Sequence, residues 1–100
     1  SWASDVPAHR AALLAAGLEG LGRGKVGRDT PALDNDWTRA MDAAVAGRRT
    51  GEAVVLAASA LRGNWAEVPP DYLRRIARAF TALGLGGEAQ LIVAEAANRG

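Results

Sequence analysis

The sequence lacks several residue types on which common functions depend. Its 100 residues include no cysteine and a single histidine, His9. The missing thiols exclude disulfides and thiolate metal sites, and one histidine cannot supply the usual ligands of a zinc site. A serine hydrolase needs a histidine with a carboxylate partner, and no such pair serves Ser1, Ser4 or Ser59. We therefore expect no metal, no cofactor and no catalytic activity in this chain.

The sequence also lacks an excess of charge and a long apolar run. Twelve basic and eleven acidic residues give a net charge of +1. This balance provides no electrostatic reason to bind nucleic acid or an anionic membrane. The apolar stretches fall well short of the about 20 residues that span a bilayer. We expect neither nucleic acid nor membrane insertion. The compartment stays open, with the cytoplasm favoured because no signal-peptide pattern is recognisable.

What the sequence does contain favours helices. Alanine accounts for 23 residues and aromatic side chains for five, within an ordinary apolar fraction of 49%. Alanine is the best helix former, and the β-branched residues that strands prefer are few. We therefore predict one all-α domain over residues 1–100.

Apolar periodicity and turn signals predict five helices. They cover approximately residues 7–21, 31–46, 51–62, 70–83 and 88–98. Short connections predict two antiparallel hairpins, one in residues 31–64 and one in residues 65–100. Residues 1–30 hold an N-terminal helix and a glycine-rich basic loop. The predicted fold is two helical hairpins plus this helix, as a short solenoid or a compact bundle.

Large side chains predict the buried face of the first helix. Leu14, Leu18 and Leu21 form its stripe, and Gly17 and Gly20 are expected to weaken its last turns by about 1 kcal/mol each.

Capping signals predict where the next two helices begin. Thr30 followed by Pro31 marks the start of the second helix, and Thr50 caps the third. The apolar face of the second helix is expected to include Leu33 and Trp37.

A spacing of 36 residues relates the two hairpins. Gly51-Glu52-Ala53 and Gly87-Glu88-Ala89 open two alanine-rich runs at this distance. The same shift pairs Trp37 with Leu73. Self-similarity at a period of about 20–50 residues is typical of stacked structural repeats.

The second hairpin also follows a known order of residue sizes. A large residue, a large-small pair and an aromatic precede a helix with Ala, a large residue and Ala: Leu73, Ile76-Ala77, Phe80, Ala89, Val93 and Ala96. This order resembles the tetratricopeptide (TPR) repeat. In the first hairpin Trp37, Ala53 and Ala60 agree with it, whereas Met41, Ala44 and Ala57 depart in size. The resemblance covers residues 34–97, with a period longer than the usual about 34 residues.

The resemblance implies a protein–protein interaction module. The second and fourth helices would line a groove that holds a peptide or a partner helix. Arg74, Arg75 and Arg78 would add contacts to an acidic partner, with Arg39 and Asp42 nearby. The alternative for these side chains is a solvated helix face.

Two further alternatives concern other parts of the chain. Trp65 lies in a predicted loop, where it would either anchor the loop on the core or meet a partner. The small-residue helices at 51–62 and 88–98 could instead pack against copies of themselves in a structural homo-oligomer. A helical accessory or regulatory domain of a larger protein is the remaining hypothesis.

Overall fold

The computed structural model is entirely helical over the residues it describes, 2–23 and 31–99. Its elements are α1 (Trp2–Gly20), α2 (Asp36–Ala46), α3 (Thr50–Leu61), the short 3₁₀ helix η1 (Trp65–Glu67), α4 (Pro70–Ala82) and α5 (Gly86–Arg99). No strand occurs in this part of the chain, so the predicted all-α class with five helices is confirmed.

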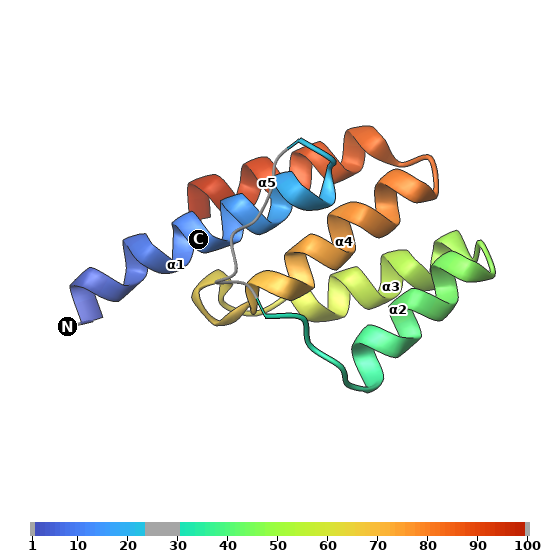
Figure 1. Cartoon of the computed structure of the whole chain (residues 1–100), viewed down its shortest axis with the longest axis horizontal. Coiled ribbons are helices and arrows are strands. Elements are labelled where there is room, and N and C mark those ends of the chain that lie inside the picture. The colour runs from blue at the N-terminus through green and yellow to red at the C-terminus, as the bar shows by residue number, and fades with distance from the viewer. Residues whose placement is uncertain (1, 24–30, 100) are drawn as a thin grey trace.

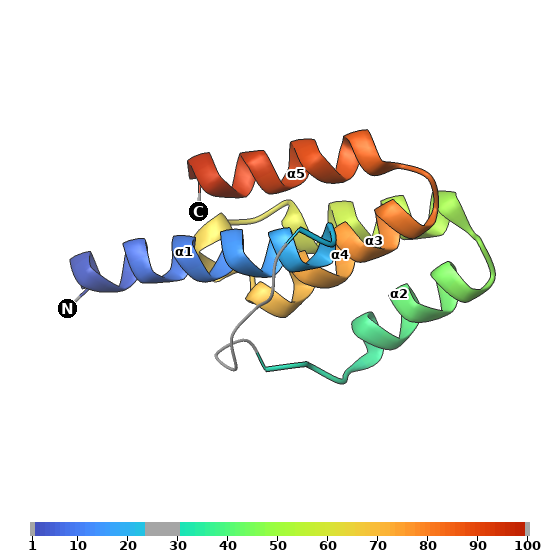
Figure 2. The same ribbon diagram turned by 45° about the horizontal axis from the view of Figure 1, so that its top comes forward.

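Helix α4 lies at the centre of the arrangement (Figure 1). The α2–α3 hairpin packs on one side of it, and α1 packs against α4 and α5 on the other. Helix α1 runs in roughly the same direction as α4, while α5 returns antiparallel to it (Figure 2). The N-terminal helix therefore covers the second hairpin, although it comes before the first hairpin in the sequence.

Two apolar clusters meet on α4. The larger fills the space between the hairpins: Met41, Ala44, Ala53, Ala57, Ile76, Ala79, Phe80, Leu83 and Ala89. The smaller joins α1 to the second hairpin: Leu13, Val68, Leu73 and Ala96. Because α4 contributes to both clusters, it links α1 to the α2–α3 hairpin.

The buried face of α1 differs from the predicted one. Leu13 and Ala16 are fully buried, whereas Leu14, Leu18 and Leu21 are only partly buried. The prediction was wrong because it followed the largest side chains. The buried face of α1 instead consists of Leu13 and the small residues that follow it at helical spacing, Ala16, Gly17 and Gly20.

Gly17 and Gly20 allow α1 to approach its neighbours closely. A Cβ atom on Gly20 would lie 2.8 Å from the Cβ of Ala77, and one on Gly17 would lie 2.9 Å from the side chain of Val93. Carbon atoms that are not bonded pack at about 3.5–4.0 Å. The expectation that these glycines only weaken the helix overlooked their part in close packing.

Helix α2 begins at Asp36, five residues after its predicted start. Asn35 caps it: its side chain accepts a hydrogen bond from the Thr38 N–H, and its own N–H donates to the Thr38 hydroxyl. Leu33 lies outside the helix because its N–H and C=O are bonded to side chains of α4. The predicted cap Thr30 falls outside the described residues.

The other helix boundaries differ by a few residues from those predicted. Thr50 is the first residue of α3 instead of its cap, a position that Arg49 takes without a side-chain bond. Gly86 and Gly87 belong to the first turn of α5.

The 36-residue spacing reappears in the geometry of the hairpins. Their boundary residues are separated by that distance: Ala46 and Ala82 end the first helices, and Thr50 and Gly86 begin the second. The same hydrogen bond closes each turn. Arg49 N–H donates to the Ala44 carbonyl, and Leu85 N–H to that of Phe80, both at 2.7 Å. The two hairpins are therefore built to one pattern.

One position of this shared turn carries an unfavourable residue. Arg48 adopts a left-handed φ of 54°, where its counterpart is Gly84 with φ 84°. This conformation costs a residue with a Cβ about 1–2 kcal/mol. We expect Arg48→Gly to raise the free energy of unfolding by about 0.5–1 kcal/mol, measured by chemical denaturation. A loss of stability would contradict this account of the turn.

Candidate functional site

Helix α4 carries a polar stripe opposite its buried face. Asp71, Arg74, Arg75 and Arg78 follow one another at i, i+3, i+4 and i+7. Residues at this spacing share one side of a helix. The opposite side is buried in the core: Leu73, Ile76, Ala77 and Phe80.

Asp71, the first residue of this stripe, is buried, with only 2% of its surface exposed. Its carboxylate accepts a hydrogen bond of 2.9 Å from the Leu33 N–H. Arg74 Nε and Arg75 Nε each donate to it at 2.9 Å, and Arg74 Nη2 donates as well. A buried carboxylate without partners would cost several kcal/mol, so these donors are what make its burial tolerable.

The donors also set the protonation of Asp71. Burial raises the pKa of Asp71 by removing water from the charged form. The hydrogen bonds from Leu33, Arg75 and Arg74 outweigh this effect, and the pKa lies below its usual value. Burial lowers the pKa of Arg74 and Arg75, but their hydrogen bonds and charge attractions to neighbouring carboxylates, Asp71 first among them, together outweigh this effect. The pKa of each arginine therefore lies above its usual value. Asp71, Arg74 and Arg75 are therefore all charged at neutral pH.

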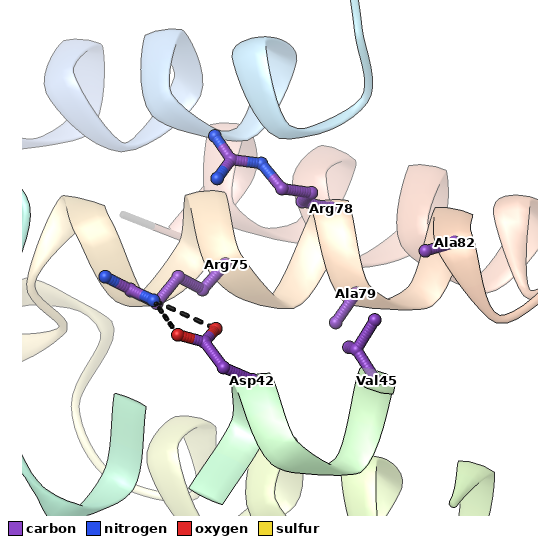
Figure 3. A pocket seen from close by; sticks show the side chains of 6 residues that line it. All are labelled: Asp42, Val45, Arg75, Arg78, Ala79 and Ala82. Carbon is purple, nitrogen blue, oxygen red and sulfur yellow. Dashed lines mark hydrogen bonds and ion pairs between the residues drawn. The ribbon is translucent and has the colours of Figure 1, made fainter. Parts of the chain in front are cut away.

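The two arginines join Asp71 to the neighbouring elements. Arg74 Nη1 donates to Glu19 Oε1 of α1 at 3.1 Å. Arg75 Nη1 donates to both carboxylate oxygens of Asp42 on α2, at 3.0 and 2.8 Å (Figure 3). We call these five residues the Asp71 cluster. Its three carboxylates face two guanidinium groups, so the charge of Arg74 and Arg75 is compensated within the fold.

A hollow of about 230 Å³ lies beside the cluster, between α2 and α4. Its lining consists of Asp42, Val45, Arg75, Arg78, Ala79 and Ala82. Val45, Ala79 and Ala82 provide an apolar surface. Figure 3 shows Arg75 turned towards Asp42 and Arg78 pointing away from that pair, towards α1. We call this feature the α2–α4 hollow.

Arg78 differs from the other arginines of the stripe. It is exposed, and it forms no ion pair with any residue in 2–23 or 31–99. Its positive charge is therefore not compensated within the described fold.

The structure brings together some of the residues proposed from the sequence and separates others. Asp42, Arg75 and Arg78 meet at the α2–α4 hollow. Arg74 instead turns to α1. Arg39 lies at the exposed start of α2, where it pairs with Asp34 at 3.0 Å and Asp36 at 3.1 Å.

Trp65 lies away from this hollow, in η1. It is half-buried and packs against the cluster that joins α1 to the second hairpin. This contact corresponds to the anchoring role considered for it.

Sequence reasoning missed Asp71, although a signal for it existed. An aspartate three and four residues before Arg74 and Arg75 on a helix is well placed to pair with both. Glu19 and Leu33 had no such signal, because they lie 55 and 38 positions from their partners on α4.

A second, more apolar hollow of about 410 Å³ separates α3 from α5. Its lining consists of Thr50, Val54, Phe80, Leu85, Glu88, Leu91 and Ile92. Val54 and Leu91 are 44% and 72% exposed there.

Two kinds of site are absent from the part of the chain that the structure describes. No three His, Cys, Asp or Glu side chains gather there in a way that could hold a metal ion. None of the helices in that part has the length and apolarity to cross a bilayer.

Comparisons with known proteins add no relative. No family model matches the sequence. Searches of curated proteins and of solved structures gave no match either.

Proposed function

We propose that this chain is a non-catalytic protein–protein interaction module that binds a peptide or a partner helix along the α2–α4 hollow. The observation that carries the proposal is Arg78, an exposed and uncompensated charge beside an apolar surface. Val45, Ala79 and Ala82 would accept apolar side chains of the partner. Arg78, which lines the hollow and points towards α1 (Figure 3), would bind a carboxylate at its edge, since guanidinium and carboxylate groups form strong paired hydrogen bonds.

The Asp71 cluster would act as a scaffold for this surface. Arg75 is held by both Asp42 and Asp71, so its orientation is set before a partner arrives. Such preorganisation lowers the entropy that binding must overcome. A partner carboxylate would have to displace Asp42 to reach Arg75, and we therefore assign recognition to Arg78.

The repeated hairpins support the same function. Stacked helical hairpins form extended surfaces that commonly bind other proteins, and the TPR resemblance of the second hairpin points in that direction. Six residues line the α2–α4 hollow, compared with about 20–30 residues on each side of an ordinary protein interface. We therefore expect weak, reversible binding.

Peptide selection tests this function directly. From a random display library, the chain should enrich peptides that carry acidic residues next to apolar ones. Arg78→Glu should weaken binding of these peptides by about 10-fold or more, because it replaces attraction with repulsion. Fluorescence polarisation with labelled peptides measures the change.

The matched control is Arg99→Glu, the same charge reversal at an exposed residue of α5. It should leave the affinity unchanged, and circular dichroism should show that both variants keep the wild-type helix content. Equal affinities of the wild type and Arg78→Glu would reject the proposed site.

A further inference from the structure

The outward face of α3 combines large apolar side chains with few charges. Val54 is 44% exposed and Val55 is 67% exposed. Between Glu52 and Arg62 the chain has no charged residue. Across the neighbouring hollow, Leu91 of α5 is 72% exposed. Val54 and Leu91 line that hollow, and Val55 lies outside its lining. Val55 is therefore the large aliphatic side chain of the outward face.

The exposed residues of this face are arranged symmetrically along the helix. Glu52, Val55, Ser59 and Arg62 are all exposed and follow one another at i, i+3, i+7 and i+10. They therefore form one stripe on the surface. Glu52 and Arg62 lie at equal distances on either side of Ala57, and so do Val55 and Ser59. At about 1.5 Å per residue, the two charges stand about 15 Å apart.

We propose that a second copy of this chain docks on this face, with the two α3 helices antiparallel about a two-fold axis that passes between Val55 and Ser59, at the level of the buried Ala57. This arrangement sets each Glu52 opposite Arg62 of the other copy. It also places the large Val55 opposite the small Ser59. One stripe thus supplies both halves of a complementary contact, as a two-fold interface requires.

The charges at the two ends are available for this contact. Arg62 forms no ion pair within the described residues. Glu52 pairs with Arg49 at 2.6 Å, yet half of its side chain remains exposed. Antiparallel helices also align their dipoles favourably.

The size of the surface sets the expected strength of the dimer. Helix α3 has 12 residues, which corresponds to a length of about 18 Å. One face of a helix of this length buries less than the about 800 Å² that each partner buries in a standard interface. We therefore expect a weak dimer that forms and dissociates reversibly. The α2–α4 hollow is not part of this surface, so the two proposals can fail independently.

Sedimentation equilibrium of the wild-type chain from about 10 µM to 1 mM should show a monomer–dimer equilibrium. Val55→Asp should lower the association constant by about 10-fold or more, because two carboxylates would lose their hydration in the contact with no positive charge opposite them and only the Ser59 hydroxyl as a donor.

Charge exchange tests the register of the two helices. Glu52→Arg and Arg62→Glu should each weaken association by about 3- to 10-fold, because each places like charges opposite one another twice. The double variant restores opposite charges and should recover most of the wild-type association.

Asp36→Arg is the matched control, since Asp36 is also an exposed acid in a first helical turn that pairs with an arginine three residues away. It should leave association unchanged. Thermal unfolding should confirm that each variant is folded at the temperature of the measurement.

Three results would overturn the proposal. The first is a monomer at every concentration, which would assign the face to a partner of another kind. The second is a dimer that Val55→Asp does not weaken, and the third is a double charge variant that is no better than the single ones.

Discussion

Replacing Gly20 with alanine should lower the free energy of unfolding by about 3 kcal/mol, because added atoms cannot fit a close-packed contact. The new Cβ would press on the Arg74 carbonyl oxygen and would lie 2.8 Å from the Cβ of Ala77 and 3.1 Å from the Arg78 nitrogen. Two of these three atoms belong to the backbone of α4, which cannot turn aside as a flexible side chain can. Urea denaturation followed by circular dichroism measures the loss.

Two other glycines serve as controls for this prediction. Gly87 is helical and exposed, with no atom within 4 Å of an added Cβ. Gly87→Ala should therefore raise stability by up to about 1 kcal/mol. The three atoms nearest to a Cβ on Gly17 belong to the side chains of Val93 and Leu73, so Gly17→Ala should cost less than Gly20→Ala. A wild-type stability for Gly20→Ala would show that α1 does not pack on α4 as described.

The second large effect is expected at Asp71. Asp71→Asn should lower the free energy of unfolding by about 3–5 kcal/mol, as the loss of one partner of a buried ion pair generally does. The substitution removes the negative charge from between Arg74 and Arg75, and the guanidinium groups are themselves largely buried, with 11% and 18% of their side chains exposed. The exposed Asp36→Asn, which also loses a pairing with an arginine, should have a far smaller effect.

The contribution of Asp71 should depend on pH in a defined direction. Its pKa is lower in the folded chain than in the unfolded one, so the unfolded state takes up a proton first as the pH falls. The stability that the charge provides is complete above the unfolded value of about 3.9 and is lost as the pH falls through the lower folded pKa. The difference between the wild type and Asp71→Asn should be constant from about pH 7 to 5 and shrink below about pH 4. A difference that grows on acidification would contradict the assignment.

The helices and their pairing could be predicted because their causes are local. Alanine content, apolar spacing and the turn signals around Gly47 and Gly84 act within a few residues of one another. The 36-residue spacing then extended that pattern from one hairpin to the other.

The start of α2 and the face of α1 could not be predicted, because both depend on contacts distant in sequence. The apolar spacing of Leu33 and Trp37 predicts that both lie in α2. In the structure the N–H of Leu33 donates to Asp71 and its C=O accepts from Arg75. The burial of Gly17 and Gly20 depends on where α4 and α5 lie, which no local pattern in residues 7–21 reveals.

The candidate site was predictable only in part for the same reason. The arginine stripe of α4 is visible in the sequence, but the stripe alone does not show which arginines are paired. The structure divides it: Arg74 and Arg75 are bound to Asp71, whereas Arg78 forms no ion pair within the described residues, which is why we propose it as the residue that binds a partner. This division is the central claim about function.

Nuclear magnetic resonance tests that claim most directly. The ¹⁵N-labelled chain would be titrated with a peptide selected on the wild type, and the backbone amide shifts would be mapped. We predict that the shifts concentrate on α2 and α4 around Val45, Arg78, Ala79 and Ala82, and that they disappear in Arg78→Glu. Shifts confined to α3 and α5, or shifts that persist in Arg78→Glu, would contradict it.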